Sequence, residues 1–233
     1  MAVIIADIET TGLDLFSDKV LEISALILDD QLTTCYTYFN QHVFVPAETV
    51  DEWVRGADPY VQKMHEDNGL WEACRVHSPD SQLIYPVALV DMFYEWSVAK
   101  TEEYADEFQE GEKRLNFVGD SNDFDNSFLF VANSGFWQHY NYHLWNLSAP
   151  TDMARVWNPA LFQDIQYAAD DNDDHRALGD CVSTWHKALI WKHLIVNAQV
   201  PNEPARLSDL YSDEKRGYTA VSYNMMRGRV PLL

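Results

Sequence analysis

The feature that most constrains the fold is an uninterrupted apolar segment near the N-terminus that ends at acidic residues. Residues 3–7 have the pattern of a strand that is buried on both faces and stops at Asp7. Residues 20–28 and 35–39 are rich in β-branched and aromatic side chains and are bounded by Asp, Gln and Asn. Together the three segments predict an antiparallel meander of three strands.

The rest of the chain alternates between predicted helices and strands. Asp58 as N-cap and Pro59 as first helical residue predict a helix start, and Asn68-Gly69 predicts its end. Apolar residues at helical spacing predict a long helix over residues 81–100. The other predicted elements are strands at residues 115–118 and 142–147 and helices at residues 124–132, 151–157 and 175–196. This order predicts an α/β fold with a mixed five-stranded sheet flanked by helices.

The length of 233 residues suits one domain with a modest extension. We predict a domain over residues 1–196 and a C-terminal extension over residues 197–233. The extension has no helical periodicity, and from Lys215 onward it carries basic residues and no acid. Two interpretations stay open: a tail that packs on the domain surface, or a basic arm that contacts phosphates.

The net charge of −21 argues against tight binding of long duplexes, because phosphate backbones attract Lys and Arg. It does not exclude metal-assisted chemistry, since bound divalent cations invert the local field at an acidic site. No apolar run approaches the roughly 18–20 residues that span a bilayer, and the N-terminus lacks the basic flank of a signal peptide. We therefore expect no membrane partner and a cytoplasmic location.

The cysteines Cys35, Cys74 and Cys181 lie far apart and form no CxxC pair. Such an odd, sparse set is typical of free thiols in a reducing compartment and argues against a structural zinc site. Since free cysteines are usually buried, we expect all three in the core.

Two acids, spaced two residues apart, lie at the C-terminal end of the first predicted strand. Residues i and i+2 of a strand point to the same face, so Asp7 and Glu9 can reach one cation. Thr10, Thr11 and Gly12 then turn the chain away, which leaves both carboxylates at the sheet edge beside solvent.

Two further acids are placed to join them. Asp125 comes just after a predicted strand, and Asp180 lies on a predicted helix five residues after His175. Four converging carboxylates would raise one another's pKa values unless cations neutralised them. Oxygen ligands suit Mg²⁺ or Mn²⁺, and two such ions can clamp the attacking and leaving oxygens of a phosphoryl displacement.

Three motifs resemble those of a known nuclease group: DIETTG at residues 7–12, NDFD at residues 122–125 and HRALGD at residues 175–180. In this order they are similar to the exonuclease motifs of the DEDDh group within the DnaQ-like, ribonuclease H-fold superfamily. The resemblance covers roughly residues 1–195 and implies a ribonuclease H-like sheet and a 3′→5′ exonuclease.

The same resemblance implies roles for five residues. Two Mg²⁺ or Mn²⁺ ions would bind to the carboxylates of Asp7, Glu9, Asp125 and Asp180. His175 would be the general base that takes a proton from the attacking water, and nucleoside 5′-monophosphates would be released. Asp123 is the alternative for the third carboxylate, although the residues that follow fit Asp125 better.

Within the superfamily, TGLD at residues 11–14 and YVQKMHEDNGL at residues 60–70 resemble oligoribonuclease. The likeness implies that Leu13 wedges against terminal bases, that Tyr60 stacks on one, and that His65 approaches the scissile bond. Packing on a helix face is the alternative for Tyr60 and His65. The predicted substrate contacts are completed by Thr10, Thr11, Gly12, Ser121 and Phe124.

The chain departs from oligoribonuclease where that family holds the 5′ phosphate. Ser121 fits the pattern, but Phe124 stands at the position of a Gln and could be a core residue instead. Ser148-Ala149-Pro150 stands where a Tyr-Arg pair supplied across the dimer is expected. These departures argue against strict selection of dinucleotides and leave a homodimer open.

We therefore predict a two-metal-ion 3′→5′ exonuclease that acts on single-stranded DNA or RNA or on short oligonucleotides. One alternative is an oligoribonuclease proper, restricted to very short RNA. Another is a binding module that keeps the fold without catalysis, and Mg²⁺-dependent release of mononucleotides would exclude it. A ribonuclease H-type endonuclease is a third, and it would still cut a substrate whose 3′ hydroxyl is blocked.

Overall fold

The structure is a computed structural model that describes residues 2–76, 82–104, 114–141, 143–170 and 175–197. Contacts divide the chain into two units, Met1–His193 and Leu194–Leu233. The strands and helices α1 to α8 lie in the first unit. The predicted extension over residues 197–233 lies almost entirely outside the described residues, so its boundary and its basic arm stay predictions.

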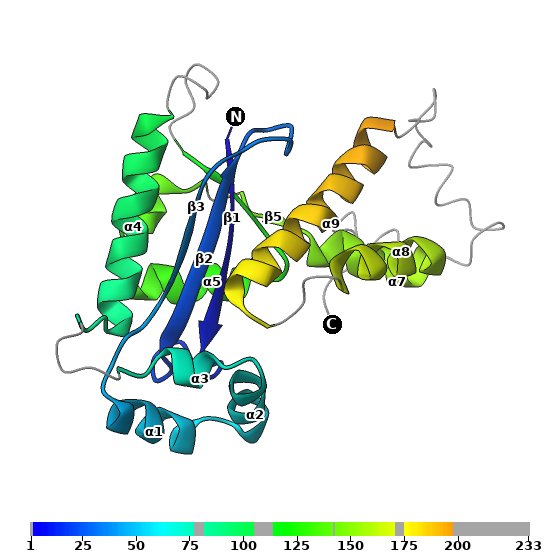
Figure 1. The fold of residues 1–233 in the computed structure, drawn as a ribbon. Helices are drawn as coiled ribbons and strands as arrows, with labels where there is room; N and C mark the ends of the chain where they lie inside the picture. The colour runs from blue at the N-terminus through cyan, green and yellow to red at the C-terminus, as the bar shows by residue number, and fades with distance from the viewer. Residues whose placement is uncertain (1, 77–81, 105–113, 142, 171–174, 198–233) are drawn as a thin grey trace, which may run out of the picture. The chain divides into compact units, whose positions relative to one another are not determined.

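A five-stranded sheet forms the centre of the first unit (Figure 1). The strands are β1 Val3–Thr10, β2 Val20–Leu28, β3 Cys35–His42, β4 Asn116–Gly119 and β5 Trp145–Asn146. Their order is β3-β2-β1-β4-β5, with antiparallel pairing from β1 to β3 and parallel pairing of β4 with both β1 and β5. The predicted fold class, with its N-terminal meander, is confirmed.

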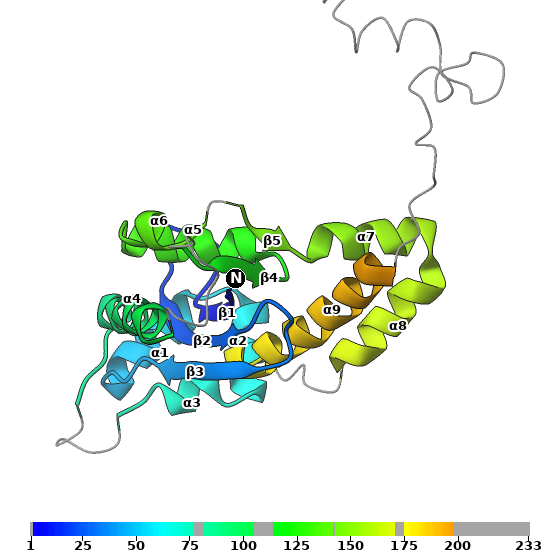
Figure 2. The same cartoon turned by 90° about the horizontal axis from the view of Figure 1, so that it is seen from above.

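Helices cover both faces of this sheet (Figure 2). On one face, Ile4, Ala6 and Ile8 of β1 share a hydrophobic cluster with α4 (Pro86–Glu103) and α5 (Asn122–Ala132). On the other face, Val3 and Ile5 cluster with Cys181 and Ala188 of α9 (Ala177–Asn197). Because side chains alternate along a strand, Asp7 and Glu9 continue the register of Val3 and Ile5 and face α9.

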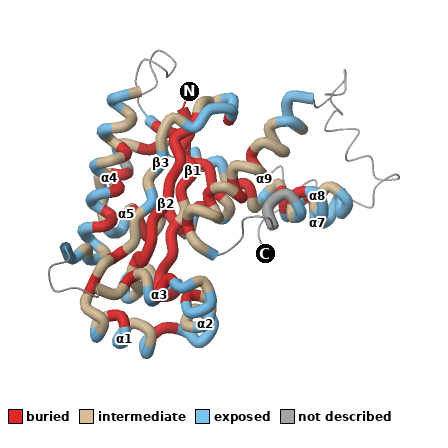
Figure 3. Tube along the Cα trace, in the orientation of Figure 1, coloured by how far each residue is buried: buried red, intermediate tan, exposed pale blue. Residues whose placement is uncertain are grey.

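Strands β1 and β2, next to each other in the sheet, are almost completely buried (Figure 3). Every residue of β2 is buried, whereas exposed positions recur along the edge strand β3. A fully buried Ile or Leu side chain contributes about 1.5–3 kcal/mol relative to an exposed one, so β1 and β2 anchor the fold. The acids at the end of β1 therefore start from a rigid support.

Three short helices lie at the end of the sheet where β1 finishes (Figure 1): α1 Ala47–Gly56, α2 Pro59–Asp67 and α3 Leu70–Ala73. The Asp58 carboxylate caps α2 by accepting a hydrogen bond of 2.8 Å from the Tyr60 backbone N–H. Gly69, with φ of 74°, separates α2 from α3 in a left-handed conformation that glycine adopts without strain. The predicted start and end of α2 are confirmed.

Several predicted boundaries and elements are corrected by the structure. The fifth strand is only Trp145–Asn146, and the next helix, α7, begins at Ser148 and ends at Trp157. Helices α1, α3, α6 (Phe136–His139) and α8 (Pro159–Asp170) were not predicted from the sequence. The last helix begins at Ala177 and not at His175, because His175 has φ of 52° and cannot belong to a right-handed helix.

The expectation of three core thiols is wrong for one cysteine. Cys74 and Cys181 are buried, but Cys35 is exposed at the start of the edge strand β3. None of the helices in the described ranges combines the length and hydrophobicity that crossing a bilayer requires.

Candidate metal and substrate site

Three of the four predicted carboxylates meet between β1 and α9. One oxygen from each of Asp7, Glu9 and Asp180 lies within 4.8 Å of the other two. Asp7 and Glu9 come from the same face of β1, and Asp180 comes from the first turn of α9, where its backbone N–H donates to the Arg176 carbonyl. This cluster will be called the carboxylate cluster.

The fourth carboxylate, Asp125, is buried next to β1 but is held by the backbone. Its Oδ1 accepts a hydrogen bond of 3.2 Å from the Ile8 N–H, between the two acids of β1. Asp125 lies in the first turn of α5, whose N-cap Ser121 has a left-handed φ of 59°. The rival Asp123 is exposed and accepts from the Asn146 side chain. The structure thus places Asp125, and not Asp123, beside the carboxylate cluster.

The surroundings of Asp7, Glu9 and Asp125 disfavour the charged form of all three side chains. Burial first, then the charges of Asp125, Glu9 and Asp180, raise the pKa of Asp7 well above its usual range. Burial and the charges of Asp180 and Glu22 raise the pKa of Glu9 to about 9. Burial raises the pKa of Asp125 to about 7, against the lowering effect of the Ile8 N–H.

Bound cations would resolve this repulsion. Carboxylate oxygens are the ligands that hard divalent cations prefer, and the cluster includes no thiolate or imidazole ligand. A cation would also favour the ionised form of each acid, reversing the effect of burial on its pKa. Asp7, Glu9 and Asp180 therefore fit a divalent metal site, with Asp125 beside it.

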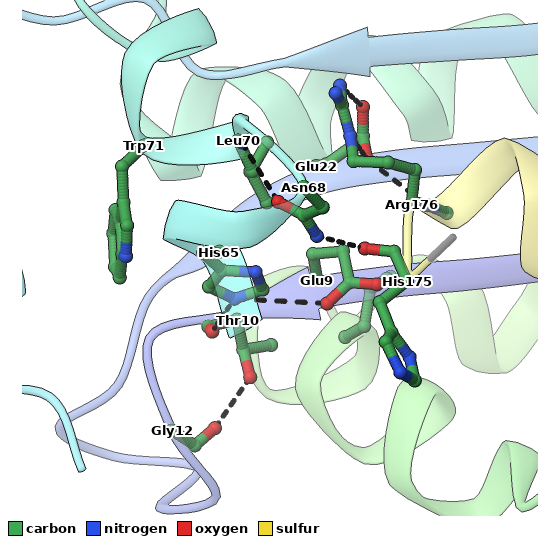
Figure 4. Close-up of polar contacts among 12 residues, drawn as sticks. Glu9, Thr10, Gly12, Glu22, His65, Asn68, Leu70, Trp71, His175 and Arg176 are labelled. Atoms are coloured by element: carbon green, nitrogen blue, oxygen red, sulfur yellow. Dashed lines mark hydrogen bonds and ion pairs between the residues drawn. The ribbon is translucent and has the colours of Figure 1, made fainter. Parts of the chain in front are cut away.

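His175 lies next to this cluster in a strained backbone conformation. Glu9 lies between His175 on one side and His65 on the other (Figure 4). A left-handed φ at a residue other than glycine costs about 1–2 kcal/mol, so neighbouring contacts must hold it. The Asn68 side-chain N–H donates to the His175 carbonyl, across 107 residues of sequence.

A buried ion pair at the start of α9 was not predicted from the sequence. Glu22 of β2 accepts two hydrogen bonds from Arg176, of 2.9 and 2.5 Å, and a third of 3.1 Å from the Ala177 N–H. Glu22 stands opposite Glu9 in the pairing of β1 with β2, and only 2% of its surface is exposed. The pair fixes α9 against the sheet at the level of the carboxylate cluster.

His65 is completely buried, so it does not face open solvent as a substrate-contacting group would. Its Nε2–H donates to the Thr10 carbonyl at 2.9 Å, and Nε2 lies 3.8 Å from the Glu9 carboxylate. Burial lowers the pKa of His65, which favours the neutral imidazole as donor. In this position His65 supports Glu9 and the end of β1.

A cavity of about 570 Å³ opens beside Glu9. Leu13 and Tyr60, which are 79% and 68% exposed, line it together with Met64 and Phe124. Phe124 also packs on the core, and its ring centroid lies 4.9 Å from that of Phe128. It therefore lines the cavity and also contributes to the core, which were the two alternatives predicted for it. The cavity thus joins a carboxylate of the cluster to exposed apolar and aromatic surface.

The turn after β1 is tightly fixed by hydrogen bonds. The Thr10 hydroxyl donates to the Gly12 carbonyl at 2.6 Å, and the Thr11 hydroxyl donates to Asp18 at 2.8 Å. A Cβ at Gly12 would lie 2.5 Å from an Asp18 carboxylate oxygen, so a larger residue would force Asp18 away from its bond to Thr11. Thr10, Thr11 and Gly12 all line the cavity, and the turn exposes Leu13.

Ser121 lies in a separate polar network. Its N–H donates to the Ser148 hydroxyl at 2.7 Å, and Ser148 donates to Asp120 at 2.5 Å. Asp120 in turn pairs with Lys187 of α9. Ser121 is not among the residues that line the cavity, so the structure does not bring it together with Leu13 and Tyr60.

The chain is similar in sequence to oligoribonucleases from several organisms. The chain is 22% identical over 206 residues to oligoribonuclease of Cutibacterium acnes, covering 88% of this chain and 91% of that protein. It is 22% identical over 209 residues to mitochondrial oligoribonuclease of Mus musculus, covering 90% and 79%. No protein-family model matches the chain.

Among solved structures, the chain is similar to exonuclease I of E. coli in a zinc-bound complex with single-stranded DNA, with a TM-score of 0.56. The match covers 84% of this chain but only 43% of exonuclease I, and at 14% identity the likeness is one of fold. The fold and the relatives together support the interpretation of this chain as a DnaQ-like 3′→5′ exonuclease. Within that class, the curated relatives point to oligoribonuclease, and the resemblance predicted from the three motifs is confirmed.

Proposed function

We propose that this chain removes nucleotides from the 3′ end of single-stranded nucleic acid or short oligonucleotides, with two Mg²⁺ or Mn²⁺ ions as cofactors. One observation carries the proposal: the carboxylate cluster opens, through Glu9, into a cavity lined by Leu13 and Tyr60. A terminal nucleotide in this cavity would have its phosphodiester near the acids and its base near the apolar side chains.

In this proposal Asp7, Glu9, Asp125 and Asp180 hold the cations. When bound, the cations lower the pKa of the attacking water and offset the charge of the phosphodiester. His175 accepts the water's proton as it attacks, in the role of general base. Electrons of the P–O3′ bond leave with the upstream sugar oxygen, and a nucleoside 5′-monophosphate is released.

The cavity walls give this enzyme a sequence-tolerant grip on its substrate. Leu13 wedges against the terminal bases, and Tyr60 stacks on one of them, which contributes about 1–3 kcal/mol per base. The buried His65 positions Glu9 and the end of β1 instead of contacting the substrate.

Substrate length is not limited to dinucleotides in this proposal. The hydroxyl of Ser121 lies 2.9 Å from that of Ser148, and the carboxylate of Asp120 accepts from Ser148. The basic side chain that joins this network, Lys187, already pairs with Asp120 and is not free to hold a 5′ phosphate. We therefore favour oligonucleotides of several lengths over an oligoribonuclease restricted to very short RNA.

The net charge of −21 supports short or single-stranded substrates and the use of cations at the site. We place the enzyme in the cytoplasm, where Cys35, which is free and exposed, stays reduced.

The experiment that tests the function digests 5′-labelled RNA and DNA of several lengths in Mg²⁺ and in Mn²⁺. Ladders that shorten one nucleotide at a time, with release of nucleoside 5′-monophosphates, are the expected result. A 3′-phosphate block should stop the reaction. Continued cleavage of the blocked substrate would point to an endonuclease, and no cleavage in either metal would leave only binding.

A further inference from the structure

Three consecutive residues before and at the start of α9 are each held by a polar side chain from another element. The carbonyl of His175 accepts from Asn68, at the C-terminal end of α2. The Arg176 guanidinium and the Ala177 N–H both donate to Glu22 of β2. Glu22 thus fixes the helix start, while Asn68 bonds to His175 itself (Figure 4).

We propose that Asn68 is a positioning residue: its side-chain amide holds His175 in the backbone conformation that places the imidazole for proton transfer. The inference rests on the proposed exonuclease reaction, in which His175 is the general base. Asn68 does not reach the reaction directly, since its two polar groups contact the backbone of Leu70 and of His175.

The geometry explains why Asn suits this position. Its Oδ1 accepts from the Leu70 N–H at 2.9 Å, which fixes the turn at Gly69 and orients the side chain. Its Nδ2 is then directed at the His175 carbonyl. Because the left-handed φ of 52° at His175 is unfavourable for a residue with a Cβ, loss of this donor would let the backbone relax.

Asn133 offers a matched control. It caps α5 as Asn68 caps α2, and its Oδ1 accepts from Gly135 at 2.9 Å. Its Nδ2 donates to Asp91 of α4 at 2.9 Å, so it also joins two distant elements. Asn133→Ala therefore removes the same two kinds of contact without affecting His175.

The test compares single-turnover cleavage of a short oligonucleotide at saturating Mn²⁺. We expect Asn68→Ala to slow cleavage about 10- to 100-fold, since small misplacement of a catalytic group has such effects, and Asn133→Ala to leave the rate unchanged. Asn68→Asp keeps the acceptor for Leu70 but loses the donor to His175, so it should be as slow as Asn68→Ala. The affinity for Mn²⁺ should not change, because Asn68 contacts no carboxylate of the cluster.

A His175→Ala background separates positioning from general destabilisation. If Asn68 acts through His175, adding Asn68→Ala there should cause no further loss of rate. An equal loss in both backgrounds, an unchanged rate for Asn68→Ala alone, or an equal loss in Asn133→Ala would overturn the inference. Hydrogen exchange at residues 175–180, which should quicken only in the Asn68 variants, tests the contact even if the wild-type protein proves inactive.

Discussion

The proposed site has two ends that are built in different ways: the carboxylate cluster with Asp125, proposed to bind metal (the metal end), and the cavity beside Glu9 (the exposed end). At the metal end, Asp7 and Asp125 lie on or against the central strand β1, and burial raises the pKa of both. At the opposite end, Leu13 and Tyr60 extend into solvent from a turn and from a short helix. One end is dense, acidic and held by the core, and the other is exposed and apolar.

This difference separates chemistry from substrate choice. Metal ligands must hold their geometry closely, and a buried strand provides such support. Stacking and wedging contacts tolerate variation, because every base presents a π-face to an aromatic ring. Changes at the metal end should therefore affect rate, and changes at the exposed end should affect binding.

The largest effect is expected at the metal end. Asp7→Asn removes a proposed metal ligand with almost no change in volume, and we expect hydrolysis to fall on the order of 10³-fold or more. The same change removes a half-buried acid whose charge is disfavoured, so the metal-free variant should unfold at higher temperature than wild type. Asp123→Asn, an exposed neighbour, is the control and should retain activity. Rates and calorimetric melting temperatures measure both effects.

A smaller effect is expected at the exposed end. Tyr60→Ala should raise KM about tenfold with little change in kcat, since stacking contributes about 1–3 kcal/mol per base. Tyr60→Phe should remain close to wild type. Tyr167 of α8 is similarly exposed but does not line the cavity, so Tyr167→Ala serves as control. A large fall in kcat for Tyr60→Ala would contradict the separation of the two ends.

A separate effect, on stability instead of rate, is expected in the absence of metal. The pKa of Glu9 is raised from 4.5 to about 9 and that of Asp125 from 3.8 to about 7, so the folded state binds more protons than the unfolded state between these values. The free energy of unfolding should therefore fall as pH rises from about 4 to about 9. Urea unfolding in EDTA measures this slope.

Added Mn²⁺ should reverse that trend, because cations bind the ionised acids of the folded state. The stabilisation by Mn²⁺ should accordingly be larger at high pH than at low pH. Glu9→Gln should flatten the pH dependence in EDTA. A slope that is the same in wild type and Glu9→Gln would show that other charged groups cause it.

Local patterns predicted much of the fold and one half of the site. The apolar run of β1 and the spacing of Asp7 and Glu9 are sufficient to place both acids on one face of a buried strand. The cap at Asp58 and the stop at Gly69 follow from residue chemistry within a few positions. These features were predictable because their causes lie close together in sequence.

Contacts between distant segments were not predictable in the same way. Asn68 was identified only as a helix stop, because its bond to His175 spans 107 residues. Glu22 did leave a signal, since an acid inside an otherwise apolar strand needs a buried partner. Likewise, the left-handed conformation of His175 depends on tertiary contacts, and the helix was therefore predicted to start two residues too early.

The most direct test of the account is anomalous diffraction from crystals soaked in Mn²⁺. The account predicts manganese at the carboxylate cluster, bound by oxygens of Asp7, Glu9 and Asp180, with a second ion that engages Asp125 when a nucleotide is present. Manganese only at other surface acids, with these four carboxylates unliganded, would contradict it.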